Sequence, residues 1–366
     1  MEFIELAELC DKGSSNLAQK DLVFDSGIYP VYGAPGEITK VDFFHQSKPY
    51  LGLIKDGAGV GRVMQLPANS SVIGTIQYIF PKENVDLKYL YYLIKYLDLG
   101  KSNTGATIPH IYFKDYKKRK VKVREYGEQK HIGQILELID SHLSAYKNVL
   151  DQYDLLIKSR FVDLFGDIEL NEKKWKKIKF GELIKSANNG LARRGNDKAG
   201  NIVLRLIELQ ENLINYSDPN RILLTDDEKK RYRLLEGDLL FARVNGNPKN
   251  VGRCATFHEY EEQVYHNDHI IRTSCDKSRL DSVFAAYLFN IEYGKNRISR
   301  KIKTSAGQYT INQEGLKSIE IILPPIVIQY SFAEFIKQIN KLKSDVQKSI
   351  DETQLLMDSL MQEYFG

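Results

Sequence analysis

The sequence EQKHIGQILELIDSHLSAYKNVLDQYDLLIKSRFVDLFG, residues 128–166, decides the fold of this chain. Its apolar residues recur in alternating steps of four and three, the heptad pattern of a long coiled-coil helix. The series is Ile132, Leu136, Ile139, Leu143, Tyr146, Leu150, Tyr153 and Ile157, then Arg160 as a polar break and Leu164. At about 1.5 Å per residue this helix reaches roughly 55 Å, longer than a small domain is wide.

The same register returns 200 positions later in the chain. The second series is Phe332, Ile336, Ile339, Lys343, Val346, Ile350, Thr353, Met357, Leu360 and Tyr364. Both helices also close alike, with Leu164-Phe-Gly in the first and Tyr364-Phe-Gly in the second. We therefore predict a duplicated chain, in which a globular domain followed by a long helix occurs twice.

The segments before the two helices repeat in the same order. Apolar runs with Gly/Asn turns predict a hairpin in each half, and a third strand and a short tyrosine-rich or apolar helix follow. The paired segments are the entries 4–9 and 178–183, the hairpins 49–63 and 237–254, the third strands 71–79 and 269–273, the helices 87–97 and 283–289, the polar loops 103–108 and 304–311, and the last strands 120–123 and 319–323.

These patterns predict an α+β fold with pseudo-twofold duplication. Two globular α/β domains, 1–127 and 167–327, alternate with long helices at 128–166 and 328–366. An apolar seam needs a partner, so we expect the helices to pair as an antiparallel coiled coil; the alternative is that each packs only on its own domain. The expected coiled-coil or partner interface is Leu136, Ile139, Leu143, Leu150, Ile157, Ile336, Ile339, Val346, Ile350 and Met357.

Composition sets wider bounds. The 366 residues are 42% hydrophobic, enough for two or three domains with proper cores. No apolar run has the length of a membrane span and the first residues are acidic, which predicts a cytoplasmic protein. Three widely spaced cysteines without a CxxC pair fit buried thiols in a reducing compartment. The net charge of +4 neither requires nor excludes nucleic acid as a partner.

Catalytic and cofactor motifs are missing from the sequence. It has no GxGxxG loop and no Walker A lysine, and Asn245-Gly-Asn-Pro248 lacks the second proline and the aromatic residue of an amino-methyltransferase motif. The acidic run 226–228 after Thr225 is typical of a helix N-cap rather than of a nuclease. His266 and His269 have no evident third metal ligand, so we favour loop or DNA-contacting histidines. We predict no catalytic residue, metal or cofactor in this chain.

Basic residues gather beside amide and hydroxyl side chains in glycine-rich loops. Lysine and arginine neutralise DNA phosphates, whereas arginine, asparagine and glutamine also read base edges in the major groove. Other basic clusters, such as the one with Arg193, Arg194 and Lys198, are read either as further contacts or as solvated faces. The expected DNA contacts are Lys55, Arg62, Thr107, His110, Arg243, Asn245, Asn247, Arg253, Lys303, Gln308 and Tyr309. For the Gly-Arg pairs at 61–62 and 252–253, a DNA contact and an arginine that bonds locally at a strand end are equally good interpretations.

The whole chain resembles the specificity subunit of Type I restriction–modification systems. The resemblance lies in Gly237-Asp-Leu-Leu-Phe-Ala-Arg243, Val251-Gly-Arg253, the loop 304–311, Leu323-Pro-Pro325 before Gln329, and the two helix endings. The first half departs from this pattern, with Arg124-Glu125 in place of the double proline and no Gly-Asp before residues 50–55.

This resemblance implies two target-recognition domains that read a bipartite, asymmetric site on double-stranded DNA. Two methyltransferase subunits would dock on the helices, and restriction subunits would join them. S-adenosylmethionine, ATP and Mg²⁺ would belong to those partners. The helices would then act as a ruler, and adding one heptad to both would change the tolerated gap between half-sites. The alternatives are a specificity subunit of a system with a fused restriction–methylation partner, and a non-enzymatic coiled-coil adaptor protein.

Overall fold

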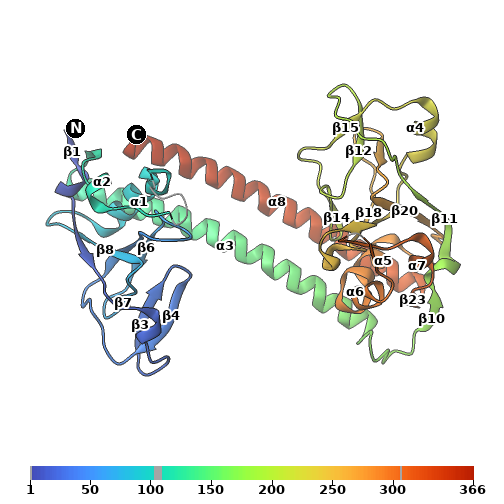
Figure 1. Cartoon of the computed structure of the whole chain (residues 1–366), viewed down its shortest axis with the longest axis horizontal. Helices are drawn as coiled ribbons and strands as arrows, with labels where there is room; N and C mark the ends of the chain where they lie inside the picture. The colour runs from blue at the N-terminus through green and yellow to red at the C-terminus, as the bar shows by residue number, and fades with distance from the viewer. Residues whose placement is uncertain (1, 103–108, 306) are drawn as a thin grey trace. The chain divides into compact units, whose positions relative to one another are not determined.

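The computed structural model describes residues 2–102, 109–305 and 307–366 (Figure 1). The chain forms two compact units. Unit 1 comprises residues 1–150 and 345–366, and unit 2 comprises residues 151–344. Each unit therefore contains one globular part and one segment of each long helix. None of the helices in the described ranges carries an apolar stretch long enough to cross a lipid bilayer.

Unit 1 is built around a four-stranded antiparallel sheet in the order β2-β8-β5-β6. A three-stranded sheet, β4-β3-β7, and the strand pair β1-β9 complete it, and helix α1 (Leu87–Leu97) packs on the larger sheet. The strands are β1 (Glu2–Glu5), β2 (Cys10–Ser14), β3 (Tyr29–Gly33), β4 (Gly36–Val41), β5 (Tyr50–Ile54), β6 (Val63–Leu66), β7 (Ser71–Val72), β8 (Ile76–Pro81) and β9 (Lys120–Val123).

Unit 2 repeats this topology strand for strand. Its sheets run β11-β20-β16-β18 and β15-β12-β19, with the strand pair β10-β23, and α5 (Ser282–Asn290) takes the place of α1. In both three-stranded sheets one strand pair is antiparallel and the other parallel. The strands are β10 (Lys176–Lys179), β11 (Ile184–Asn189), β12 (Asn201–Leu204), β15 (Arg221–Ile222), β16 (Leu239–Ala242), β18 (Cys254–Thr256), β19 (Val264–His266), β20 (Ile270–Cys275) and β23 (Glu320–Leu323). The predicted duplication is confirmed.

Unit 2 also has elements that have no described counterpart in unit 1. These are the hairpin β13 (Leu209–Gln210) with β14 (Leu213–Ile214), the helices α4 (Asp226–Tyr232) and α6 (Glu292–Ser299), and a small sheet, β17-β22-β21. Its strands are β17 (Val244–Asn245), β21 (Lys303–Ser305) and β22 (Gln308–Thr310). Short helices α2 (Phe113–Tyr116) in unit 1 and α7 (Gln313–Lys317) in unit 2 precede the last strand of each unit.

Two local predictions were wrong. The segment 71–79 is two strands rather than one, because β7 pairs with β3 whereas β8 pairs with β5, and a turn at Gly74 separates them. The segment 304–311 is largely a hairpin rather than a loop. Gly307 in that hairpin has a φ of +76°, a conformation that glycine adopts without steric cost. The corresponding loop 103–108 lies outside the described residues.

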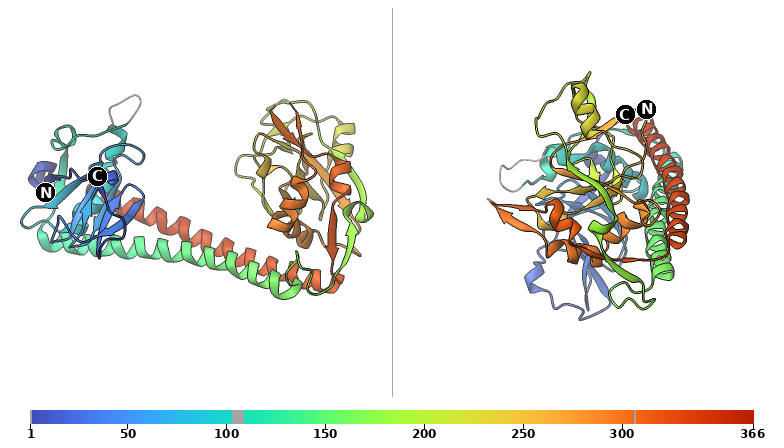
Figure 2. Two further views of the ribbon diagram at one scale, coloured as in Figure 1. Left: turned by 60° about the horizontal axis from the view of Figure 1, so that its bottom comes forward. Right: turned by 90° about the vertical axis from the view of Figure 1, so that its right-hand side faces the viewer.

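The long helices α3 (Tyr126–Phe165) and α8 (Ile326–Phe365) each have 40 residues and run side by side within each unit (Figures 1 and 2). In unit 2, Asp154 Oδ1 lies 2.6 Å from Lys343 Nζ, and the rings of Phe161 and Phe332 are 5.3 Å apart. Residue numbers therefore rise along one helix as they fall along the other. The antiparallel pairing is confirmed, and each unit has both helices in its core.

The apolar seam rotates near the end of each helix. The heptad pattern predicts Arg160 and Leu164 at the seam, but Phe161 and Phe165 are the fully buried residues there. A helix with 3.6 residues per turn drifts from a 3.5-residue repeat, and here the phenylalanines turn toward the core of unit 2, where they contact Phe284. In unit 1, Met361 and Phe365 are the corresponding buried residues.

A buried glutamine ties each long helix to the globular part of its unit. Gln329 is 0% exposed; its Oε1 accepts from Asp281 N (2.9 Å), and its Nε2 donates to Arg279 O (3.1 Å) and Pro324 O (2.7 Å). Gln129, 200 positions earlier and 2% exposed, makes the same three kinds of bond, with Asp86 N (3.0 Å) and with two carbonyls. Asp86 and Asp281 are in turn the N-caps of α1 and α5.

We predict that Gln329→Leu lowers the free energy of unfolding of unit 2 by about 2 to 4 kcal/mol, because it removes a buried amide and leaves three backbone groups, one of them in a buried residue, without this partner. The measurement is urea unfolding followed by the emission of Trp175, the single tryptophan, which lies in unit 2 and donates to Phe165 O. Gln338→Leu is the matched control, since Gln338 is an exposed glutamine on the part of α8 that belongs to unit 2. Equal losses from both variants would contradict the anchoring role.

Candidate nucleic-acid interface

The small sheet of unit 2 brings together predicted contacts that are about 60 residues apart in sequence. Asn245 on β17 pairs with Tyr309 on β22, and β22 pairs in turn with β21, which begins at Lys303. The side chains of Lys303 and Gln308 are exposed, and Lys303 has no ion-pair partner among the described residues. The sheet therefore exposes an ammonium group and an amide, whereas Asn245 and Tyr309 are half-buried and Tyr309 packs against the core of unit 2.

The other predicted contacts of unit 2 bond within the unit. Arg243 Nη1 donates to Asp268 O (3.2 Å), and Arg253 Nη2 donates to Leu206 O (3.2 Å). Burial lowers the pKa of Arg253, which fits a half-buried structural arginine. Asn247 Oδ1 accepts from Lys249 N and caps a short helical turn. Arg253 thus makes the local bond that the sequence offered as the alternative for the Gly-Arg pairs, and Asn247 also bonds locally.

The predicted contacts of unit 1 lie around the end of the β5–β6 hairpin. Lys55 Nζ is 3.7 Å from Asp56 Oδ2, and Asp56 forms a β-bridge with His110. The rings of His110 and Tyr112 are 4.9 Å apart. Arg62 Nη2 donates to Ala34 O, again a local bond. Thr107 lies outside the described residues.

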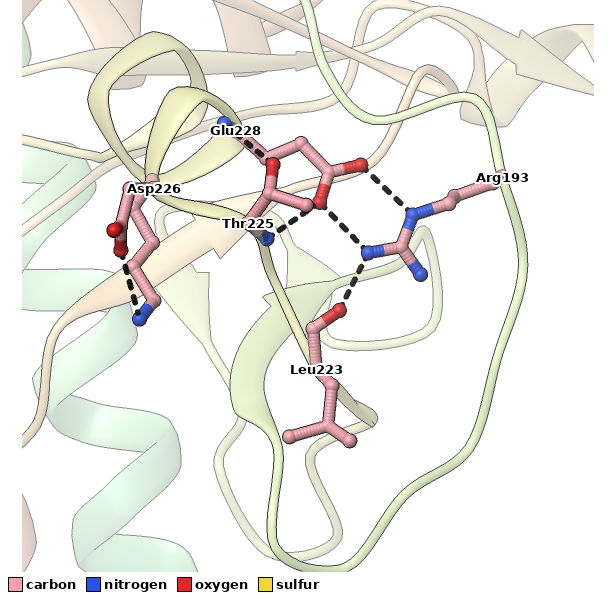
Figure 3. A network of polar contacts seen from close by, with 6 residues as sticks. Arg193, Leu223, Thr225, Asp226 and Glu228 are labelled. Atoms are coloured by element: carbon pink, nitrogen blue, oxygen red, sulfur yellow. Dashed lines mark hydrogen bonds and ion pairs between the residues drawn. The ribbon is translucent and has the colours of Figure 1, made fainter.

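The acidic run at 226–228 is a helix cap, as predicted (Figure 3). Thr225 Oγ1 accepts from Glu228 N (3.3 Å), while Glu228 Oε2 accepts from Thr225 N (2.9 Å). Arg193 Nε and Nη2 donate to the two carboxylate oxygens of Glu228, at 2.8 and 2.7 Å. These bonds lower the pKa of Glu228 to about 2, with the hydrogen bond from Arg193 as the largest cause.

The two histidines of the 266–269 segment have different environments. His266 is fully buried, which corrects the expectation of a loop or DNA-contacting residue. Its Nδ1 lies 3.1 Å from Tyr232 O and must donate, and burial lowers its pKa to about 4. His269 is half-buried, and its Nε2 lies 3.0 Å from Arg194 Nη2 and must accept. Among the described residues, no group of three His, Cys, Asp or Glu is placed to hold a metal ion.

Sequence reasoning missed one feature of unit 2, a pocket lined by Arg193, Arg194 and Arg205 together with Asn267 and His269. The basic pair Arg193-Arg194 was visible as a cluster. Arg205 and the 267–269 turn reach the same pocket only through the pairing of β12 with β19, and no local pattern signals that pairing.

Comparison with known proteins places the chain in a family. The model of the Type I restriction modification DNA specificity domain matches residues 1–152 and 172–353, which include most of both units. This chain belongs to that family.

Three similar proteins agree with this assignment. The StySPI specificity subunit of Salmonella potsdam is 26% identical over 277 residues, and the EcoKI specificity subunit of Escherichia coli is 22% identical over 278. Each match covers 72% of this chain and 60% of the relative, so this chain spans less than two thirds of their length. The crystal structure of a Type I restriction-modification S subunit from M. genitalium has the same fold, with a TM-score of 0.68, 15% identity, and coverage of 100% of this chain and 96% of that one.

The buried His266 predicts an acid-sensitive unit 2. Its folded-state pKa lies below the unfolded value of 6.5, so the full stability is present above pH 6.5 and is lost as the pH falls toward 4. A shift of this size corresponds to about 3 kcal/mol. Urea unfolding followed by Trp175 emission between pH 7 and pH 4 measures this loss. His266→Gln should reduce the pH dependence by that amount, and an unchanged acid profile in the variant would show that another group is responsible.

Proposed function

We propose that this chain is the DNA-reading subunit of a Type I restriction–modification complex and that it recognises a bipartite, asymmetric target without an active site of its own. The observation that carries the proposal is a repeated topology to which unit 2 adds further elements. The two units share the order of every main sheet, but the hairpin β13-β14 and the helix α4 of unit 2 have no counterpart among the described residues of unit 1. Two modules of one design with different surfaces suit two different half-sites.

In this proposal the recognition domains are residues 1–127 and 167–327. Gln308 reads a base of one half-site, and Lys303, on the same face of the sheet, contacts a phosphate beside it. Asn245 and Tyr309 lie on the opposite face and position these two residues. Amide side chains read adenine edges well, and an unpaired ammonium suits a phosphate oxygen. Lys55 and His110, with Thr107, serve the other half-site. We call the sheet β17-β22-β21 the reading sheet. Arg243 supports it, because Ile311 N donates to Arg243 O and the guanidinium of Arg243 donates to Asp268 O in the 267–269 turn.

Loss of a base contact and loss of a phosphate contact should change DNA affinity in different ways. Gln308→Ala should weaken binding by about 1 to 3 kcal/mol on DNA that contains the half-site read by unit 2. The preference for the half-site read by unit 1 should not change. Lys303→Ala should weaken binding to all duplexes and reduce the slope of log K against log salt by about 1. The measurement is DNA binding by the assembled complex at several salt concentrations. If both variants lose the same factor on every duplex, the reading sheet has no role in recognition.

We further propose that two methyltransferase subunits dock on the long helices at equivalent positions. Leu155 and Leu156 on α3 are 63% and 46% exposed, and Leu355 and Leu356 on α8 are 71% and 50% exposed. The leucine pairs are 200 positions apart, and one lies in each unit. Exposed leucines that are repeated by the duplication, rather than scattered singly, favour two copies of one partner.

Charged substitutions in these pairs predict a change in stoichiometry. Leu156→Glu or Leu356→Glu should each remove one methyltransferase, because the partner would have to bury a carboxylate. Native mass spectrometry of the co-expressed complex counts the copies, and we expect two for the wild type and one for each variant. Leu138→Glu is the matched control, since Leu138 is 59% exposed on α3 but residue 338 is a glutamine. Two copies retained in both variants would contradict the proposed docking surface.

A further inference from the structure

Unit 2 contains a half-open pocket of about 410 Å³. Arg193, Arg194 and Arg205 line it together with His269, Asn267 and Asn220. Three apolar residues and a glycine complete the lining, and none of the residues around the pocket is acidic. Three guanidinium groups thus meet at one hollow of the surface.

Each of these arginines is held by its own carboxylate, which lies outside the lining of the pocket. Arg193 pairs with Glu228 through two bonds, and Arg194 Nη1 donates to Asp268 Oδ1 (2.8 Å). Arg205 pairs with Glu208, whose carboxylate is buried and also accepts from Arg205 N (2.6 Å). The carboxylates therefore contact the guanidinium groups directly but do not themselves line the hollow.

The arginines in these ion pairs still have N–H groups that can donate to a ligand. An arginine carries five N–H donors. Arg193 uses Nε and Nη2, and Figure 3 draws no bond from its third nitrogen, Nη1, to the other residues shown there. Arg194 uses both Nη1 hydrogens, on Ala192 O and Asp268, and one Nη2 hydrogen on His269, which leaves two donors. Because the ion pairs already restrict these side chains, ligand binding would cost little additional side-chain entropy.

Backbone hydrogen bonds fix the walls of the pocket. Asp268 N donates to Leu191 O (3.0 Å), and Asn267 N donates to Leu204 O (3.0 Å). These bonds join the segments that carry Arg194, His269 and Arg205. The 267–269 turn also accepts from Arg243 at Asp268 O, and Arg243 directly precedes β17 of the reading sheet. The pocket and the predicted base-reading residues thus share one rigid support.

The geometry points to a site for a phosphate group of the DNA backbone. We propose that Arg193, Arg194 and Arg205 bind one phosphodiester next to the half-site that unit 2 reads, with His269 as a positioning residue that accepts from Arg194. A phosphodiester has acceptors and a negative charge but no donors, which matches a lining of guanidinium and amide groups without carboxylates. Surface ion pairs alone contribute little to stability, so stability does not explain why all three converge. This inference rests on the proposed function.

The test uses the complex of this chain with its methyltransferase and two duplexes of equal length, with and without the mapped target. The double variant Arg193→Ala/Arg194→Ala should bind both duplexes on the order of tenfold or more weakly. Its slope of log K against log salt should be shallower by about 1, since the loss of one phosphate contact removes about 0.9. The variant Arg193→Ala/Arg194→Lys, which restores one positive charge, should recover part of the slope that the double alanine variant loses. Lys295→Ala, which breaks an exposed ion pair with Glu211 elsewhere in unit 2, should change neither quantity.

The outcomes separate this inference from the proposed function. If the double variant binds both duplexes as the wild type does, the pocket does not contact DNA. A loss confined to the target duplex with an unchanged salt slope would mean that the arginines read a base, and it would overturn the phosphate assignment. If the wild-type complex itself does not prefer the target duplex, the proposed function fails. Unchanged Trp175-detected unfolding of the double variant checks that unit 2 remains folded.

Discussion

The amide of one buried glutamine per unit is the constraint on which the rest of the structure depends. Gln129 and Gln329 stand in the first turns of the long helices and bond to the residues that cap α1 and α5. A neutral amide can satisfy a donor and two acceptors at once, so it fixes the direction in which each helix leaves its unit. The strand pairs β1-β9 and β10-β23 lie immediately before the long helices and add a second attachment. In our proposal, the long helices present their partner-binding positions reproducibly because their starts are held in this way.

Carboxylates orient the arginines on the surface of unit 2 that we propose to contact DNA. Glu228, Asp268 and Glu208 each orient an arginine, and Asp238 lies 3.0 Å from Arg272 in the same unit. In our proposal, this pairing of charges accounts for DNA binding by a chain whose net charge is only +4. The paired arginines contribute direction and geometry rather than bulk charge, whereas an unpaired lysine such as Lys303 contributes charge. In our proposal, affinity and specificity therefore reside in different side chains.

The sequence predicts the scaffold well and the site poorly, for a physical reason. The heptads, the 200-residue repeat, the hairpins and the cap at Thr225 follow from local periodicity and local hydrogen bonding, and the structure has all of them. The rotation of the seam to Phe161 and Phe165 depends on what the helix end meets, and the burial of His266 depends on the packing of β19. The hairpin at 303–310 and the convergence of Arg193, Arg194 and Arg205 require strand pairings between distant segments. The placement of Asn245 beside Tyr309 has the same origin.

The central claim is that two unequal modules in this chain specify a two-part DNA target. The most direct test is genome-wide mapping of methylated adenine in cells that express the neighbouring methyltransferase with this chain, without it, or with unit 2 surface variants such as Gln308→Ala. The account predicts a split, asymmetric motif that requires the chain and whose second part alone changes in the variant. A motif that persists without the chain, or a variant that alters both parts together, would contradict it.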